Sequence, residues 1–205
     1  MKYIAHRGIS SKYEDNTVPA IKEALDREYY GVELDVQLCK TGEIVVYHDV
    51  YTPEGFVNEL TFDELKKLGI YSLQEIYDAL PGIRDVVLIV DIKGNDPLVA
   101  FALQRFYQDE DTSKVYFSSF NRKLVRLLPS NFNIGTTLET TFVPQEFDTV
   151  TKGVQCVVLH WTSLDCEFIA HCKARDIQVF TYTHKEPQEH EYMLRYDVDA
   201  IITNG

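Results

Sequence analysis

The sequence lacks long hydrophobic runs, closely paired cysteines and a leader segment. Its longest apolar stretch, VVLIV at residues 86–90, is far shorter than the ~20 residues that a membrane-spanning helix requires. The four cysteines show no C-x-x-C spacing, and a chain of 205 residues needs no disulfide to fold. The opening residues MKYIAHRG do not show the charged, apolar and cleavage-site succession of a secretory signal. These absences predict a cytoplasmic protein with free thiols and no membrane span.

Basic residues are scarce as well. The chain has 20 Lys and Arg residues against 32 Asp and Glu, which gives a formal net charge of -12 and a pI near 4.9. This balance argues against nucleic acid and anionic membranes as partners, because both attract clustered Lys and Arg. The net negative charge also repels phosphate compounds, so any phosphate chemistry requires a local site of positive charge.

Short apolar runs alternate with helical patterns along most of the chain. Several runs are continuous, which is typical of parallel strands covered on both faces. Eight such runs with helices between them predict one α/β domain, a (β/α)8 TIM barrel, with a doubly wound open sheet as the alternative. The expected strands are residues 3–5, 32–38, 86–92, 115–118, 133–138, 156–159, 177–182 and 200–203. The expected helices are 18–30, the capping-box segments 61–65 and 72–76, and segments near 97–109, 121–128, 165–175 and 187–195.

One stretch, residues 33–49, leaves no room for a helix between two apolar runs. Antiparallel strands need only a turn, so the stretch predicts a hairpin that turns at Thr41 and Gly42. With these two residues as the loop, His48 pairs with Asp35 and shares its face. A register shift of one residue would turn His48 to the opposite face of the hairpin. Residues from about 49 to 70 then form a small insertion above the barrel.

Two pairs of charged residues are the most informative feature present. Glu33 and Asp35 lie in one strand-like run, and Asp91 and Lys93 end another. Residues two apart on a strand share a face, with Cα atoms about 6.6 Å apart. The active site of a TIM barrel lies at the carboxyl ends of its strands, where both pairs fall. Three carboxylates there predict a site for one hard divalent cation, Mg²⁺ or Ca²⁺, with Lys93 near a bound phosphate.

Two histidines and an arginine fall at the same end of the predicted barrel. His6 and Arg7 follow the first strand, and His48 follows the hairpin. Imidazole titrates near neutral pH, so two histidines on opposite sides of phosphorus can serve as base and acid. The guanidinium of Arg7 can hold phosphate oxygens beside Lys93.

Each feature taken alone has a simpler interpretation. Glu33 and Asp35 could form the solvated face of an edge strand, and Asp91 with Lys93 could be a surface ion pair of little energetic value. The apolar run VVLIV that precedes Asp91 argues against a solvated strand there. The combination of all these residues at strand ends favours a functional site.

At these residues the chain resembles the glycerophosphodiester phosphodiesterase (GDPD) family. The central block and the two histidines carry the resemblance most specifically, and Asp91 stands where the family usually has Glu. The matching segments are AHRG (5–8), EDNT (14–17), ELDVQLCKTGEIVVYHD (33–49), LTFDEL (60–65), SLQEI (72–76), VDIKG (90–94), FSSF (117–120) and DAIITNG (199–205).

The resemblance implies a TIM barrel that hydrolyses glycerophosphodiesters to glycerol 3-phosphate and an alcohol, in lipid and glycerol metabolism. It implies one divalent cation, Mg²⁺ or Ca²⁺ with Mn²⁺ as a further candidate. It also implies an intramolecular route in which the glycerol 2-hydroxyl attacks phosphorus before water opens the cyclic phosphate. The implied roles are acid-base catalysis by His6 and His48, metal binding by Glu33, Asp35 and Asp91, and phosphate binding by Arg7 and Lys93.

Two other functions are kept as alternatives. A lysophospholipase D would use the same site on lysophospholipids and needs an apolar groove, for which Tyr51, Phe56, Trp161 and Tyr182 are candidates. A barrel that binds phosphate compounds without turnover is the non-enzymatic alternative, and the retained histidines and carboxylates argue against it. In each case the partner is a small molecule, and the sequence leaves the oligomeric state open.

Overall fold

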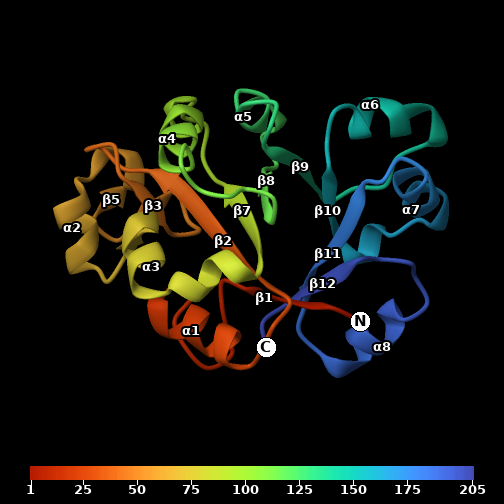
Figure 1. Ribbon diagram of the computed structural model, residues 1–205, viewed down its shortest axis with the longest axis horizontal. Helices are drawn as coiled ribbons and strands as arrows, with labels where there is room; N and C mark the ends of the chain where they lie inside the picture. Colours follow the sequence, from red (N-terminus) through yellow and green to blue (C-terminus); the bar gives the residue numbers. More distant parts are fainter.

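Eight parallel strands close into a barrel in the computed structural model, which describes residues 1–205. The first strand pairs in parallel with both the second strand and the last, so the sheet has no open edge in the barrel (Figure 1). The predicted TIM barrel is therefore confirmed, and the open sheet is excluded. The barrel strands are β1 (Tyr3–His6), β2 (Gly31–Leu38), β7 (Val87–Ile92), β8 (Val115–Ser118), β9 (Asn133–Leu138), β10 (Cys156–His160), β11 (Gln178–His184) and β12 (Ala200–Thr203).

Helices follow most of the barrel strands and surround them (Figure 1). Thr17 caps the first helix, and the predicted capping boxes Thr61/Glu64 and Ser72/Glu75 are confirmed. One helix, α6, was not expected, because its five residues are too few to show a helical period in the sequence. The helices are α1 (Val18–Asp26), α2 (Phe62–Lys67), α3 (Leu73–Ala79), α4 (Leu98–Phe106), α5 (Arg122–Val125), α6 (Phe147–Thr151), α7 (Cys166–Lys173) and α8 (Pro187–Met193). Four 3₁₀ turns complete them, η1 (Val57–Glu59), η2 (Pro81–Asp85), η3 (Pro144–Glu146) and η4 (Trp161–Ser163).

Side chains alternate in direction along the barrel strands, so the buried residues form one cluster outside the barrel and one inside it. One set of residues points outward and packs with the helices in a cluster of 39 buried side chains. The other set points into the barrel, where eight buried residues form a smaller cluster. On β7, Val87 and Ile89 belong to this inner cluster, and the next inward position is Asp91. The inner rows thus change from apolar to charged toward the carboxyl ends of the strands.

The hairpin after β2 has a different register from the predicted one. Strand β3 (Ile44–Val46) is antiparallel to β2, with Val36 opposite Val46. Cys39 N donates to Glu43 O, so the loop has three residues, and Gly42 adopts a φ of +94° in it. Tyr47, whose N–H donates to Asp35 O at 3.0 Å, therefore stands opposite Asp35, and the predicted pairing of His48 with Asp35 is wrong.

A small group of elements lies beside the barrel between β3 and α3 (Figure 1). It contains the two-stranded pair β4 (Tyr51–Thr52) and β5 (Gly55–Phe56), then α2, and then β6 (Tyr71–Ser72), which pairs with β3. These elements pack against the β2–β3 hairpin in a shared cluster of buried residues, which are Cys39, Val45, Val57, Leu65 and Ile70.

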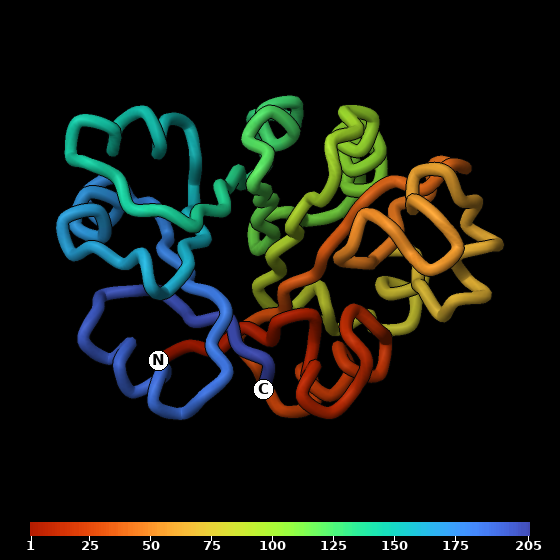
Figure 2. Tube along the Cα trace, turned by 180° about the vertical axis from the view of Figure 1, so that it is seen from behind, coloured from red at the N-terminus to blue at the C-terminus, as the bar shows by residue number.

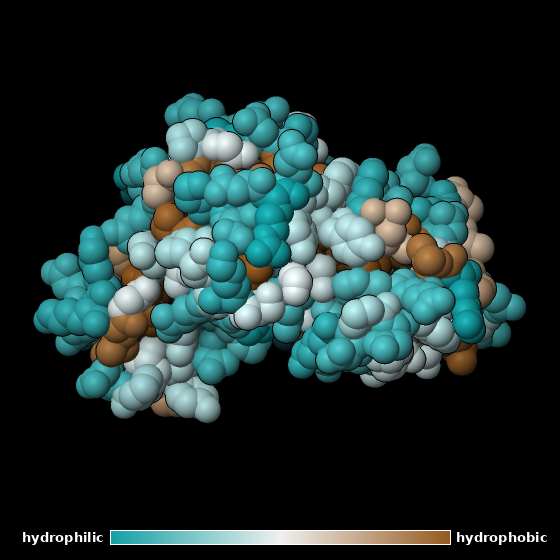
Figure 3. Space-filling model, turned by 90° about the horizontal axis from the view of Figure 1, so that it is seen from below, coloured by the Kyte–Doolittle hydropathy of each residue, from teal (hydrophilic) through white to brown (hydrophobic).

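The trace in Figure 2 shows the first and last strands side by side, as their register requires. None of the helices has the length and apolar character needed to cross a bilayer. On the face shown in Figure 3, hydrophilic residues cover most of the surface, and hydrophobic residues form small separate groups.

Replacement of Gly8 by alanine is expected to lower the free energy of unfolding by about 2–4 kcal/mol. Gly8 has a φ of +82°, and a Cβ there would lie 2.5 Å from the backbone carbon of Ala20. Gly42→Ala is the matched control, since Gly42 also has a positive φ but nothing within 4 Å of its added Cβ. The control should cost only about 1 kcal/mol. Urea unfolding of both variants tests this, and equal losses would contradict a role for the close contact.

Candidate active site

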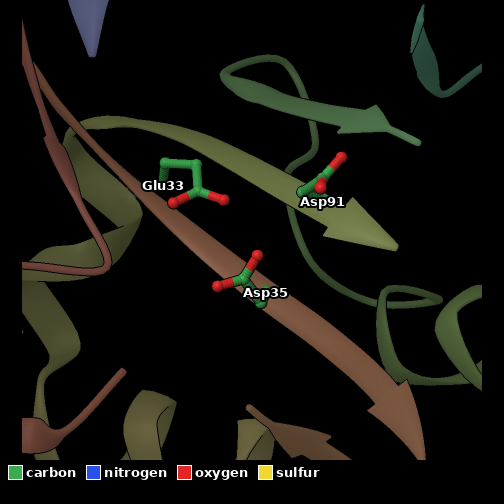
Figure 4. Close-up of side chains that lie close together, drawn as sticks. All are labelled: Glu33, Asp35 and Asp91. Atoms are coloured by element: carbon green, nitrogen blue, oxygen red, sulfur yellow. The ribbon is translucent and has the colours of Figure 1, made fainter. Parts of the chain in front are cut away.

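Three buried carboxylates meet at the carboxyl ends of β2 and β7. Glu33 and Asp35 are two residues apart on β2, and Asp91 lies directly beside Asp35 in the parallel register. One oxygen from each carboxylate lies within 4.8 Å of the others, and all three side chains are buried. Figure 4 shows the three side chains close together, with Glu33 and Asp35 on β2 turned toward each other and Asp91 beside them on β7. The register of β2 and β7, and not sequence proximity, brings Asp91 to the pair.

Two cations lie against this cluster. Lys93 Nζ is 3.0 Å from Asp35 Oδ1 and 2.6 Å from Asp91 Oδ2. Arg7 Nε is 2.9 Å from Asp35 Oδ2, without hydrogen-bond alignment, and Arg7 Nη1 donates to Asp15 Oδ2 at 2.9 Å. Burial opposes the charge of Lys93, but Asp91 and Asp35 outweigh it and raise its pKa. Burial also opposes the charge of Arg7, and Asp35 with Glu33 raises its pKa in the same way.

The pKa shifts of the three carboxylates differ with the number of fixed cations that each one contacts, which is two for Asp35, one for Asp91 and none for Glu33. Burial favours the neutral form of Asp35, but Lys93 and Arg7 outweigh it, so the pKa of Asp35 is lowered. Burial and the neighbouring Asp35 raise the pKa of Glu33 well above its usual value. Burial also raises the pKa of Asp91, against the opposing effect of Lys93. Full ionisation of the three carboxylates would carry more negative charge than the two fixed cations balance, and burial together with this repulsion favours the neutral form of Glu33.

Three neutral side chains fix the carboxylates in place. Asn16 binds Asp35 twice, through Nδ2 to Oδ2 at 2.9 Å and through Oδ1 to the Asp35 N–H at 3.2 Å. Ser118 and Thr137 each donate to Asp91 Oδ1 at 3.0 Å. Neither Asn16 nor Thr137 was expected from the sequence to contact the carboxylates. Both come from other strands or loops, and only the inward position of Thr137 on β9 could have signalled it.

His6 lies at the inner wall of the site, and one of its ring nitrogens is hydrogen-bonded. Its Nδ1 is 2.8 Å from Asn204 Oδ1, beyond the end of β12, and its Nε2 is 3.9 Å from Glu33 Oε2. Burial and the charge of Arg7 lower the pKa of His6 to about 4. His6 is thus neutral at pH 7, with Nε2 free of any hydrogen bond to protein. The contact with Asn204 was not predicted, because 198 positions separate the two residues.

His48 enters the site from the segment that follows β3. Its side chain is 42% exposed, and its Nδ1 lies 2.7 Å from Asp49 Oδ1. The chain leaves the ladder after Val46, and this change of direction brings His48 to the cavity despite the altered register.

One cavity of about 150 Å³ joins all seven predicted site residues. A second cavity of about 430 Å³ adjoins it, and Arg7 and His48 line both. The first cavity is lined by His6, Arg7, Glu33, Asp35, His48, Asp91 and Lys93, together with residues in or just after strands β7 to β12, such as Phe120, Glu139 and Tyr182.

The donor set fits a hard divalent cation. The cluster offers carboxylate oxygens and no sulfur or imidazole ligand, which suits Mg²⁺ or Ca²⁺ better than zinc. Asp35 Oδ1 is buried without a hydrogen bond, although Lys93 Nζ lies near it. A buried carboxylate oxygen without such a partner is unusual in a protein, and a cation ligated there would satisfy it.

The structure is a TIM barrel with an acidic cluster, two fixed cations and two histidines at its strand ends. These are the groups expected in a phosphoric diester hydrolase. The sequence profile of the Glycerophosphoryl diester phosphodiesterase family matches residues 6–86 and 77–205. The chain therefore belongs to the glycerophosphoryl diester phosphodiesterase family, and the predicted resemblance and enzyme class are confirmed.

Two relatives align with nearly the whole chain. The chain is 28% identical to a glycerophosphodiester phosphodiesterase of Caldanaerobacter subterraneus subsp. tengcongensis, with 98% of this chain and 93% of the relative covered. It is 41% identical to the uncharacterized protein YqiK of Bacillus subtilis, with 99% and 94% covered.

Solved structures show the same fold. A glycerophosphodiester phosphodiesterase of Parabacteroides distasonis aligns with a TM-score of 0.81 at 25% identity, covering 99% of this chain and 92% of that one. A phosphodiesterase of Oleispira antarctica, in complex with the product sn-glycerol-3-phosphate, aligns with a TM-score of 0.87 at 19% identity, covering 100% and 93%.

Proposed function

We propose that this protein hydrolyses glycerophosphodiesters to glycerol 3-phosphate and an alcohol, with one divalent cation and two catalytic histidines. The observation that carries the proposal is the single cavity in which the acidic cluster, Arg7, Lys93, His6 and His48 meet. The product bound in the Oleispira antarctica phosphodiesterase supports this substrate class. The protein would act on a small molecule, in lipid and glycerol metabolism.

The acidic cluster has the role of holding the cation. Glu33, Asp35 and Asp91 would bind Mg²⁺, Ca²⁺ or Mn²⁺, and the bound ion would neutralise charge on a phosphate oxygen. Arg7 and Lys93 keep Asp35 ionised, and their remaining N–H groups can hold the other phosphate oxygens. Asp91 is shorter than glutamate, but Ser118 and Thr137 fix its direction within the cluster.

The two histidines have the role of moving protons. His6 is neutral and presents a free Nε2 to the cavity, so it can accept a proton. His48 is the more exposed of the two and lies beside the carboxylate of Asp49. One histidine removes the proton from the attacking hydroxyl while the other protonates the leaving alcohol, and the pair reverses these roles when water opens a cyclic phosphate.

The alcohol has room beyond His48. The second cavity adjoins the first through Arg7 and His48 and is nearly three times as large. It is open to alcohols of different size, which predicts broad tolerance of the leaving group. Of the four aromatic residues considered for a lipid groove, only Tyr182 lines the site cavity, whereas Phe56 lines another cavity that shares Lys93 with it. Glycerophosphodiesters are therefore favoured over lysophospholipids.

A panel assay with purified protein tests the proposal. Glycerophosphocholine, glycerophosphoethanolamine and glycerophosphoglycerol should all release glycerol 3-phosphate in the presence of Mg²⁺, Mn²⁺ or Ca²⁺, and lysophosphatidylcholine should react more slowly. Enzymatic detection of glycerol 3-phosphate measures the first three, and choline release measures the last. Faster turnover of the lysolipid would replace the proposal by a lysophospholipase D, and no turnover with any ion would leave a phosphate-binding barrel.

A further inference from the structure

We infer that Gln37 is the positioning residue of His48, and that its amide holds the histidine in the active site by binding the backbone on both sides of it. The inference rests on the proposed role of His48 in hydrolysis. Gln37 would not touch the substrate, and it would act only through the placement of the imidazole.

The geometry is that of a clamp. Gln37 Nε2 donates to Tyr47 O at 2.8 Å and to Asp49 O at 2.7 Å, the two carbonyls that flank His48. An amide nitrogen has two N–H groups, and both are used here. Gln37 is 5% exposed, so these hydrogen bonds are largely sheltered from water. Burial makes the loss of either bond more costly than at the surface.

Gln37 is suited to this role by its place on β2. It follows Glu33 and Asp35 at the next position of the same strand face. The strand that supplies two of the three carboxylates thus also anchors the segment that carries His48. This common support fixes the distance between the histidine and the acidic cluster.

The segment itself has little other support. Strand β3 ends at Val46, and residues 47–50 form no regular secondary structure. The backbone N–H of Tyr47 donates to Asp35 O, and the backbone N–H of Val57 donates to Val50 O. The ring of His48 makes a hydrogen bond only to the adjacent Asp49. Asp49 belongs to the same segment and would move with it. Gln37 is the only side chain of the barrel that donates to the backbone beside His48.

Loss of the clamp should therefore move His48 rather than disrupt the metal site. Small displacements of a reacting group are costly, because a shift of about 1 Å can lower a rate by roughly 100-fold. The carboxylates keep their own contacts with Asn16, Ser118 and Thr137, none of which involves Gln37.

The test compares Gln37→Met, which keeps the length but removes both donors, with Gln37→Glu, which offers only acceptors to the two carbonyls. Both are expected to lower kcat on glycerophosphocholine by about 10- to 100-fold, with little change in KM. Mn²⁺ affinity, measured by calorimetry, should be unchanged. Gln74→Met is the matched control, since Gln74 binds only Asp78 on the surface of α3 and should leave kcat unchanged.

Nuclear magnetic resonance of histidine-labelled protein provides a second measurement that does not depend on turnover. The His48 resonances, assigned from their absence in His48→Ala, should shift or broaden in Gln37→Met, while those of His6 stay in place. Unchanged His48 resonances, unchanged kcat, or an equal loss of metal affinity would overturn the inference. If the wild-type protein hydrolyses none of the substrates, the proposed function fails, and the resonances alone still decide whether Gln37 holds His48.

Discussion

Replacement of either His6 or His48 by alanine is expected to lower kcat for glycerophosphocholine by about 10²–10⁴-fold, because a positioned acid or base contributes that much to a rate. The two histidines line the same cavity from different elements, β1 and the segment after β3. In the proposed mechanism they would act at different atoms of the reaction, so neither could replace the other. Steady-state assays with saturating metal ion measure the effect.

A matched control separates lost chemistry from lost structure. His171→Ala removes an imidazole on α7 that contacts Thr151 and Asp148, outside the site cavity, and should leave kcat nearly unchanged. Circular dichroism and Mn²⁺ binding should match the wild type in both active-site variants. Near-normal turnover in either His6→Ala or His48→Ala would remove that residue from the acid-base pair.

Excess chelator is expected to stop hydrolysis, and added Mg²⁺, Mn²⁺ or Ca²⁺ is expected to restore it. The acidic cluster is buried, and burial with mutual repulsion raises the pKa of Glu33 strongly. A divalent cation would relieve this repulsion and would bind Asp35 Oδ1, which has no hydrogen bond. Activity against metal concentration, after dialysis with EDTA, measures the requirement.

Asp35→Asn tests the same site by direct binding. The charge of Asp35 offsets the charges of Arg7 and Lys93, which it contacts. Its neutralisation removes a metal ligand charge and leaves both cations less compensated, so Mn²⁺ binding should weaken by at least about tenfold. Asp78→Asn, on the exposed side of α3, is the control and should bind Mn²⁺ like the wild type. Full activity in excess EDTA, or equal Mn²⁺ affinity in the two variants, would exclude the metal role.

The sequence predicted the barrel because its strands carry a strong signal. Strands covered on both faces are continuous apolar runs, and all eight were placed within one or two residues of their ends. The same logic predicted that charged residues at the ends of those runs would meet, since parallel strands direct their carboxyl ends to one rim. The carboxylates on β2 and β7 follow this rule.

The hairpin register and the long-range contacts could not be read in the same way. A loop of two residues and a loop of three differ by one position in the pairing, and the sequence around Thr41 and Gly42 permits both. The partners of the site residues, Asn204 for His6 and Gln37 for the His48 segment, are amides with no pattern of their own. Their roles depend on tertiary contacts that only the closed barrel creates.

The pairing of β1 with β12 bears on how the barrel closes during folding. His6 and Asn204 are separated by 198 positions, so their contact requires β12 to have joined β1. Strand β1 can pair early with β2, which is near it in the sequence, but its other edge stays uncovered until β12 docks. The site should therefore be completed only when the barrel closes, and chains in which β12 has not docked should be prone to associate through the uncovered edge of β1.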